Sequence, residues 1–191
     1  MKMEVKEESQ NALRFSLAGV GTGCANALRR AAINSVSTFA IDRISFYENT
    51  SAMFDDYIAH RIGLVPITTP AKGYADDTEV LFTLEAVGPK TVYSGELVSS
   101  DPGVKVANQN IPLIKLAEGQ KVRAEGKAVI GKGSRHSKFQ PGIISYDLEA
   151  DDSFNFYVET FGQMPPREII NKACEIIRDE LKDIGKAVGK L

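Results

Sequence analysis

Two glycine-rich stretches contain the residue types that could bind a phosphate group. SLAGVGTGCANALRRA, residues 16–31, leads from an alternating apolar run through clustered glycines into a segment of helical pattern, as a dinucleotide-binding turn does. Cys24 replaces the third glycine of that fingerprint. GKAVIGKG, residues 126–133, has the glycine and lysine spacing of a P-loop but ends in Gly133, where Ser or Thr would hold magnesium. A nucleotide-binding enzyme is therefore one hypothesis; the broken motifs favour the alternative, tight turns in which glycine allows positive φ.

Nucleophiles, histidines and paired carboxylates are the other candidates for chemistry. Cys24 would lie at a helix N-terminus, where the helix dipole lowers a thiol pKa, but a small buried residue packed in the turn is the simpler interpretation. His60 and His136 are the only histidines, and neither has a metal-binding spacing. Adjacent acidic pairs such as Asp55-Asp56 are more typical of solvated loops than of acid/base or metal sites. The sequence therefore predicts no active site in this chain.

Composition narrows the function classes further. Lys and Arg total 23 against 25 Asp and Glu, and this balance disfavours a free-standing nucleic-acid-binding protein. Two cysteines cannot build a disulfide framework or a four-cysteine metal site. The start MKMEVKEES has no apolar core of a signal peptide, and no run approaches the ~18 apolar residues of a membrane helix. We therefore expect a reduced, cytoplasmic setting with no membrane association.

The elements that position these residues follow from hydrophobic periodicity. Alternation over residues 12–17 predicts a half-buried strand, with a hairpin partner in the first residues, and helical spacing predicts a helix over about 24–37. From residue 49 to about 148, strand patterns alternate with turn signals, which indicates a separate β-rich lobe. A strand at 154–159 follows, and Pro165-Pro166 opens the last helix, where proline is tolerated in the first turn.

The last helix has the strongest pattern. Its apolar residues follow a 4-3-4-3-4-3 spacing typical of a three-heptad seam: Ile170, Cys174, Ile177, Leu181, Ile184, Val188 and Leu191. A helix that covers only its own domain needs a more modest face, so we predict that part of this stripe contacts another chain. The alternative is a terminal helix lying on its own sheet.

Several motifs resemble one protein family over essentially the whole chain, in order. ANALRRAAINSVSTFAID (25–42) and ENTSAMFDDYIAHRIGLVPI (48–67) resemble the α-like assembly subunit of multisubunit RNA polymerases. GKGSRHSKFQPG (131–142) and PPREIINKA (165–173) are similar to the same subunit. The resemblance is to the archaeal branch of this family, which is related to bacterial α and to the third-largest eukaryotic polymerase subunit.

The resemblance implies an α+β fold with the α-like two-lobe architecture. In this family a discontinuous dimerisation domain of strands and two helices, here residues 1–48 and 149–191, is interrupted by a β-rich insert domain, here residues 49–148. The family also implies a non-catalytic assembly platform, because catalysis and magnesium binding belong to the large subunits.

The implied partners are the small subunit L in a heterodimer, the largest and second-largest subunits, and the small subunits N and P, with DNA reached only through the complex. A homodimeric scaffold like bacterial α is the alternative.

The resemblance and the helical pattern together assign these residues to the L interface: Leu28, Ala32, Ile170, Cys174, Ile177, Leu181, Ile184 and Val188. Arg29, Arg30, His60 and Arg61 are assigned to the large-subunit interface, where an arginine fork suits carboxylates; solvated arginines and a packed or capping His60 are the alternatives.

Two expectations concern cofactors and nucleic acid. Several archaeal relatives carry a cysteine-rich ferredoxin-like domain, but this chain lacks the cysteines and the added length, so no iron–sulfur cluster or other cofactor is expected. A basic loop holds Lys132, Arg135, His136 and Lys138. Contact with nucleic acid is one interpretation of this loop; a protein contact within the polymerase, or solvation, is favoured over it.

Overall fold

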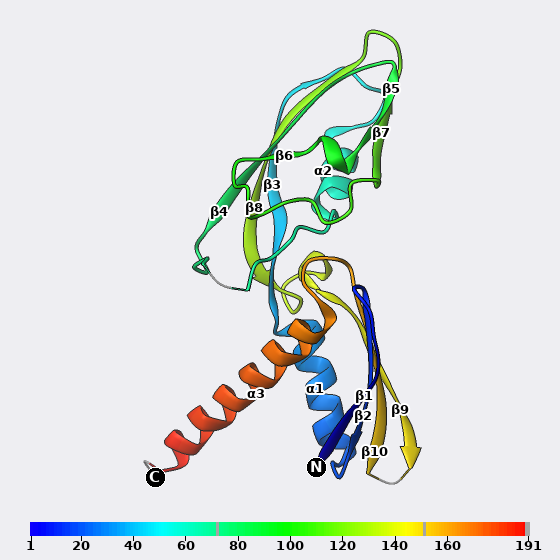
Figure 1. Cartoon of the computed structure of the whole chain (residues 1–191). Coiled ribbons are helices and arrows are strands. Elements are labelled where there is room, and N and C mark those ends of the chain that lie inside the picture. Colours follow the sequence, from blue (N-terminus) through cyan, green and yellow to red (C-terminus); the bar gives the residue numbers. More distant parts are fainter. Residues whose placement is uncertain (72, 151, 190–191) are drawn as a thin grey trace. The chain divides into compact units, whose positions relative to one another are not determined.

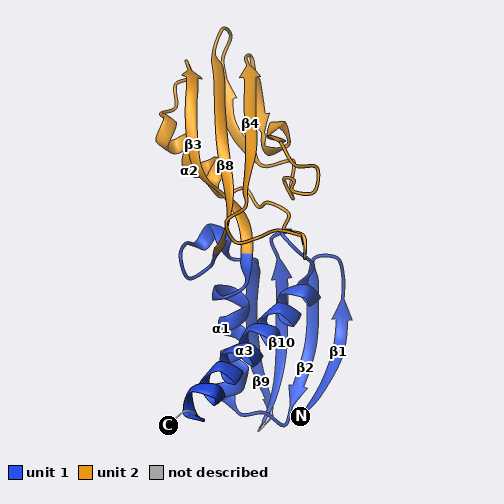
Figure 2. Ribbon diagram, turned by 90° about the vertical axis from the view of Figure 1, so that its left-hand side faces the viewer, with its two compact units in different colours: residues 1–37, 132–191 blue, residues 38–131 orange. Residues whose placement is uncertain are grey.

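The computed structural model describes residues 1–71, 73–150 and 152–189 (Figure 1). The chain forms two compact units (Figure 2). Unit 1 consists of residues 1–37 and 132–191, and unit 2 of residues 38–131. Among the described residues, no helix is long and apolar enough to cross a membrane.

Unit 1 is built on an antiparallel sheet of four strands. The strand order is β1 (Lys2–Glu8), β2 (Ala12–Ala18), β10 (Ser153–Thr160) and β9 (Gly142–Ala150). The alternating residues of β2 and β10 place Phe15 opposite Phe156, and their rings stack with centroids 4.8 Å apart. One face of the sheet is therefore apolar and requires a covering layer.

Two helices cover this face (Figures 1 and 2). Helix α1 (Thr22–Asn34) follows β2 through Gly19, whose φ of 75° supplies the turn, and α3 (Pro166–Val188) follows β10. The resulting core joins both helices to the strands; its members include Leu13, Phe15, Leu28, Phe154, Phe156, Ile169 and Ile170. A short 3₁₀ helix, η2 (Ser137–Phe139), precedes β9.

Unit 2 contains a second antiparallel sheet. Its order is β3 (Ser37–Asn49), β8 (Lys121–Lys132), β4 (Glu79–Val87) and β6 (Val98–Ser99). A ribbon of β5 (Lys90–Tyr93) and β7 (Pro112–Leu116), the turn η1 (Ser94–Glu96) and helix α2 (Asp55–Gly63) complete the unit. Ile58 and Ile62 of α2 enter the core of this unit beside Phe39, Phe82 and other apolar residues.

The predicted α+β class with two lobes is confirmed, but the predicted boundaries differ from the division between the units. The units divide at 37/38 and 131/132, rather than at 48/49 and 148/149. The first boundary moves because β3 is one uninterrupted strand that pairs with β8 in the second sheet. The second moves because β9 pairs with β10 in the first sheet. The names dimerisation domain and insert domain stay predictions.

The P-loop-like stretch is a strand. Residues 126–132 belong to β8, where Gly126 lies opposite Phe82 of β4. A Cβ at Gly126 would lie 2.8 Å from Ile41 Cγ2, so this glycine permits close packing inside unit 2. The backbone amides in such a paired strand serve the sheet ladder and do not form a phosphate-binding loop.

Candidate protein interface

Burial changes sharply along the apolar stripe of α3, which we call the α3 seam: Ile170, Cys174, Ile177, Leu181, Ile184 and Val188. Ile170 is only 4% exposed, whereas Leu181, Ile184 and Val188 are 62%, 60% and 61% exposed. Leu191, the last residue of the predicted stripe, lies outside the described residues. The unit covers the beginning of the seam and leaves its continuation open to solvent.

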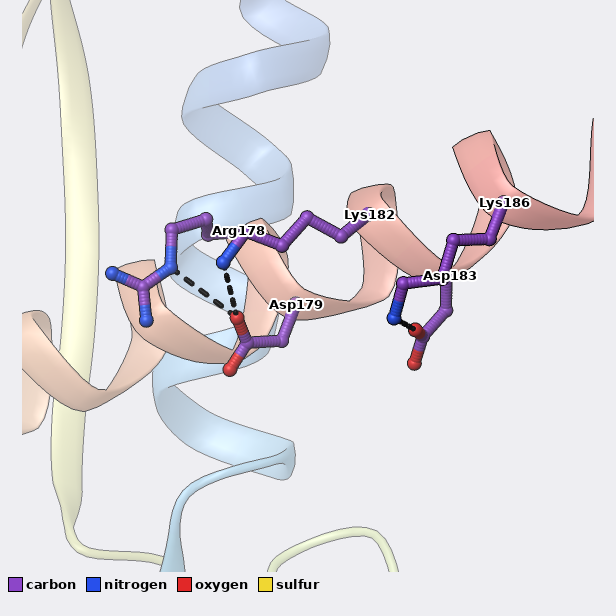
Figure 3. Close-up of polar contacts among 5 residues, drawn as sticks. All are labelled: Arg178, Asp179, Lys182, Asp183 and Lys186. Carbon is purple, nitrogen blue, oxygen red and sulfur yellow. Dashed lines mark hydrogen bonds and ion pairs between the residues drawn. The ribbon is translucent and has the colours of Figure 1, made fainter. Parts of the chain in front are cut away.

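Charged residues on the rest of this helix pair with one another (Figure 3). Asp179 Oδ1 accepts hydrogen bonds from Arg178 Nε and Lys182 Nζ, both at 3.3 Å, and Lys186 Nζ donates to Asp183 Oδ1 at 2.9 Å. These donors lower the pKa of Asp179. Pairs three residues apart support a helix locally, so this half of α3 keeps its shape while its apolar side lacks cover.

An apolar groove of about 620 Å³ lies beside the seam from Ile170 to Leu181. Its walls come from the sheet and from both helices of unit 1 and include Met1, Met3, Phe15, Leu17, Cys24, Ala27, Leu28, Ile170, Cys174, Ile177 and Leu181. Met1 and Met3 are exposed. Contiguous apolar surface of this kind is typical of sites that bind another protein, a ligand or a membrane.

A second groove of about 400 Å³, which we call the Arg30 groove, also borders α3. Arg30, Asn34 and Ala27 line it from α1, and Glu180 and Ile184 are among the residues that line it from α3. Since Ile177 and Leu181 line both grooves, the α3 seam forms the ridge between them.

The two adjacent arginines of α1 have different environments. Arg29 is half-buried, and its Nε and Nη2 donate to Asn26 Oδ1 at 3.3 and 2.9 Å. Arg30 is exposed and makes no hydrogen bond or ion pair with any residue that the structure describes. Arg30 is therefore the arginine whose donors are available to another molecule.

Both cysteines line the apolar groove as free, exposed thiols. Desolvation, with a smaller contribution from the neighbouring Cys24 and Glu175, raises the pKa of Cys174. The interpretation of Cys24 as a buried packing residue is wrong, because α1 begins at Thr22 and turns Cys24 toward the groove. No group of three or more His, Cys, Asp or Glu side chains suited to a metal occurs among residues 1–71, 73–150 and 152–189.

The residues predicted to bind subunit L fall into three groups: buried in the core, lining the apolar groove, and exposed on the α3 seam. Ala32 is fully buried in the core of unit 1, so it supports the surface without forming part of it. Leu28, Ile170, Cys174 and Ile177 line the apolar groove, and Leu181, Ile184 and Val188 extend it as exposed seam. Sequence reasoning missed the part of the groove lining that Met1 and Met3 provide, although the alternation of Met1, Met3 and Val5 at an edge strand was a usable signal.

His60 and Arg61 belong to α2 in unit 2, not to the surface described above. Both are exposed, which removes the packed-histidine alternative for His60. Arg61 Nη2 donates to the carbonyl oxygen of Pro112, so this guanidinium ties α2 to β7.

The chain matches a known protein family over most of its length. The model of the RNA polymerase Rpb3/Rpb11 dimerisation domain matches residues 14–181. Among curated relatives, the "DNA-directed RNA polymerase subunit Rpo3" of Pyrococcus furiosus is 45% identical over 152 residues, 76% of this chain and 58% of the relative. The protein of the same name from Methanocaldococcus jannaschii is 44% identical over 155 residues, 81% and 79% of the two chains. That of Halobacterium salinarum is 31% identical over 240 residues, 97% and 96%. The chain thus spans 58–59% of the length of the Pyrococcus and Thermococcus relatives that it matches.

Proposed function

Because the chain belongs to the RNA polymerase Rpb3/Rpb11 dimerisation family, we propose that it is an assembly subunit of an archaeal-type DNA-directed RNA polymerase. Unit 1 is the dimerisation domain, and its apolar groove and exposed α3 seam bind the small subunit L. Unit 2 corresponds to the insert domain of the family. The chain itself carries no reaction centre and acts in the cytoplasm through the assembled enzyme.

The exposed half of the α3 seam is the observation that carries this proposal. Leu181, Ile184 and Val188 repeat at the spacing of a helix-packing seam but find no cover within unit 1. The seam is continuous with the groove through Leu181, which lines it. A second chain with an apolar helix of similar spacing would complete both, and burial of such surface drives association.

Arg30 supports the second step of assembly, capture of the large subunits. It is exposed and lines a second groove beside the seam. A guanidinium without a partner recognises carboxylates through paired hydrogen bonds. We propose that Arg30 contacts the second-largest subunit, with the largest subunit and subunits N and P joining the same platform.

Co-expression of this chain with subunit L tests the function directly. Size-exclusion chromatography with light scattering should show a one-to-one heterodimer, which then retains the large subunits when tagged and purified. A stable homodimer that subunit L does not dissociate would favour the bacterial α-like scaffold instead. Absence of both complexes at micromolar concentration would refute the proposed function.

A further inference from the structure

The two cysteines of the chain, Cys24 and Cys174, are far apart in the sequence but line the same apolar groove of unit 1. Both are free, exposed thiols. Cys24 belongs to the first turn of α1, and Cys174 belongs to α3. The assembly role proposed above uses the groove but gives its two thiols no task of their own.

The neighbours of the two cysteines show that the thiols lie on facing sides of α1 and α3. Cys24 is one helical turn from Leu28 on α1. Cys174 is one helical turn from Ile170 on α3. Leu28 and Ile170 are both buried in the core that joins the two helices, and both line the groove together with the cysteines. The thiols therefore lie beside the contact between α1 and α3.

Packed helices bring facing residues to the spacing that a disulfide requires. The axes of packed helices lie about 8–10 Å apart, and each helix places its Cα atoms about 2.3 Å from its axis. Directly facing Cα atoms are then about 3.5–5.5 Å apart, and residues just beside the contact are a little farther apart. A disulfide joins Cα atoms that are about 4.4–6.8 Å apart. A bridge between these two helices therefore needs no rearrangement of unit 1.

Electrostatic coupling between the thiols is a second sign that they are neighbours. Desolvation is the main cause that raises the pKa of Cys174, and the charge of Cys24 raises it further, by more than that of Glu175, the next residue along α3. Since Coulomb interactions weaken with distance, this order places Cys24 close to Cys174. The raised pKa leaves Cys174 with little thiolate, so we expect a disulfide reagent to react first at Cys24.

We propose that Cys24 and Cys174 form a reversible disulfide between α1 and α3, and that this bridge prevents the groove from binding subunit L. The Cys24 thiolate attacks one sulfur of a small-molecule disulfide, RSSR, which forms a mixed disulfide and releases RS⁻. The Cys174 thiolate then attacks the Cys24 sulfur, which forms the bridge and releases the second RS⁻. The two protein thiols are oxidised, RSSR is reduced to two thiols, and the two cysteine protons pass through solvent to the released RS⁻ groups.

The effect on pairing rests on the proposed function, whereas formation of the bridge does not. Both cysteines belong to the lining of the groove, so a bond between their sulfur atoms ties its α1 wall to its α3 wall. Protein interfaces pack as densely as protein interiors, and such packing tolerates little misfit. Walls that are tied together cannot adjust to an entering helix, so only the reduced chain should assemble.

Ellman's reagent, which is itself a disulfide, tests the bridge on the full chain. Close thiols should consume one reagent molecule per chain, release both of its halves, and leave an intact mass that is lower by two hydrogen atoms. In the matched control Cys174→Ala, Cys24 should instead retain one half of the reagent as an adduct. A product of the unaltered chain that carries an adduct on each cysteine, or a chain that does not react, would overturn the proposal.

Thermal melting shows whether unit 1 accommodates the bridge. The bridged chain should melt at a higher temperature than the reduced chain, because a cross-link that closes a loop of about 150 residues lowers the entropy of the unfolded chain. A lower melting temperature would show that the bridge distorts the fold, and it would refute the assignment.

Titration with labelled subunit L measures the effect on the groove. The bridged chain should bind subunit L at least about tenfold more weakly than the reduced chain, as expected when the burial of about one apolar side chain is lost. Dithiothreitol should restore binding. Equal affinities of the bridged and reduced chains would refute the switch.

A variant without thiols is the control for this titration. In Cys24→Ala/Cys174→Ala, Ellman's reagent should leave the affinity for subunit L the same as in the untreated variant, and a loss as large as that of the unaltered chain would contradict a role of the bridge. If the reduced, unaltered chain does not bind subunit L, the proposed function fails and the effect on pairing fails with it. The mass of the product still decides whether the bridge forms.

Discussion

Replacement of Leu181 provides the sharpest test of the exposed seam, because a matched control lies on the same helix. Leu181 and Ile170 both belong to the α3 seam, but Leu181 is 62% exposed and Ile170 only 4%. The same chemical change at the two positions should therefore act on different processes. At Leu181 it should affect association, and at Ile170 it should affect folding.

The burial values set the expected magnitudes. Full burial of a leucine side chain contributes about 1.5–3 kcal/mol, so the exposed 62% of Leu181 leaves about 1–2 kcal/mol for a partner to gain. Leu181→Ala should therefore weaken pairing with subunit L by about 5- to 30-fold. Leu181→Asp also places a carboxylate in the interface at a cost of several kcal/mol, which should abolish pairing at micromolar concentration. Ile170→Asp loses nearly the full burial term and inserts a charge into the core, so a domain of ordinary stability should unfold.

Circular dichroism, thermal melting and titration with labelled subunit L separate these outcomes. The Leu181 variants should retain the helical spectrum and a melting temperature close to that of the unaltered chain, and only their dissociation constants should rise. Leu181→Ala with unchanged affinity would refute the role of the seam in pairing. If the Leu181→Asp variant unfolds as extensively as the Ile170→Asp variant, the conclusion that unit 1 covers Ile170 but leaves Leu181 exposed is refuted.

Three further predictions concern the arginine, the thiols and one ion pair of unit 1. Arg30→Ala should leave pairing with subunit L unchanged and reduce capture of the second-largest subunit by about one to two decades in a quantitative pull-down, since a charge-assisted contact contributes about 1.5–3 kcal/mol. Cys24 and Cys174 should both react with Ellman's reagent when the chain is not paired with subunit L. Cys174 should react more slowly at mildly alkaline pH, because its raised pKa leaves less thiolate. Binding of subunit L should protect both thiols, since both line the apolar groove. The Arg167 guanidinium, which donates a hydrogen bond to Glu8, holds the pKa of that carboxyl below its usual 4.5. The ion pair therefore stabilises the folded state above pH 4.5, and this stabilisation is lost as the pH falls through the lowered pKa. Arg167→Gln should make the melting temperature less dependent on pH in that acidic range.

Hydrophobic periodicity predicts those strands and helices that bury one face and expose the other. The alternation of β2 and the helical spacing of α1 and α3 each record a side that must be buried, and the structure has these elements within a few residues of their predicted ends. The predicted start of α1 at Cys24 lies two residues after the observed start at Thr22. Cys24 lies outside the buried stripe of α1, which consists of Ala25, Leu28, Ala31 and Ala32, so its side chain is exposed and the predicted burial is wrong.

Unit boundaries and the burial of single residues depend on contacts between residues far apart in the sequence, so local periodicity does not predict them. Nothing local in residues 37–49 indicates that most of this strand packs in a different unit from the helix before it; the pairing of β3 with β8, more than seventy residues away, decides this. Likewise, Ala32 and Leu181 both fit a helical stripe, but only the packing of α3 on α1 and the sheet buries one and leaves the other open. The spacing of a seam therefore identifies a candidate interface, whereas the position at which its own domain stops covering it requires the tertiary structure.

Exposed apolar residues differ in what they imply, and their arrangement distinguishes the cases. Leu81, Val87 and Val98 are exposed on strands of unit 2 without forming a helical stripe, and single apolar residues on a surface are ordinary. The exposed residues of α3 repeat at helix-packing intervals beside a groove, and a helix with this repeat lacks only a second helix to pack against.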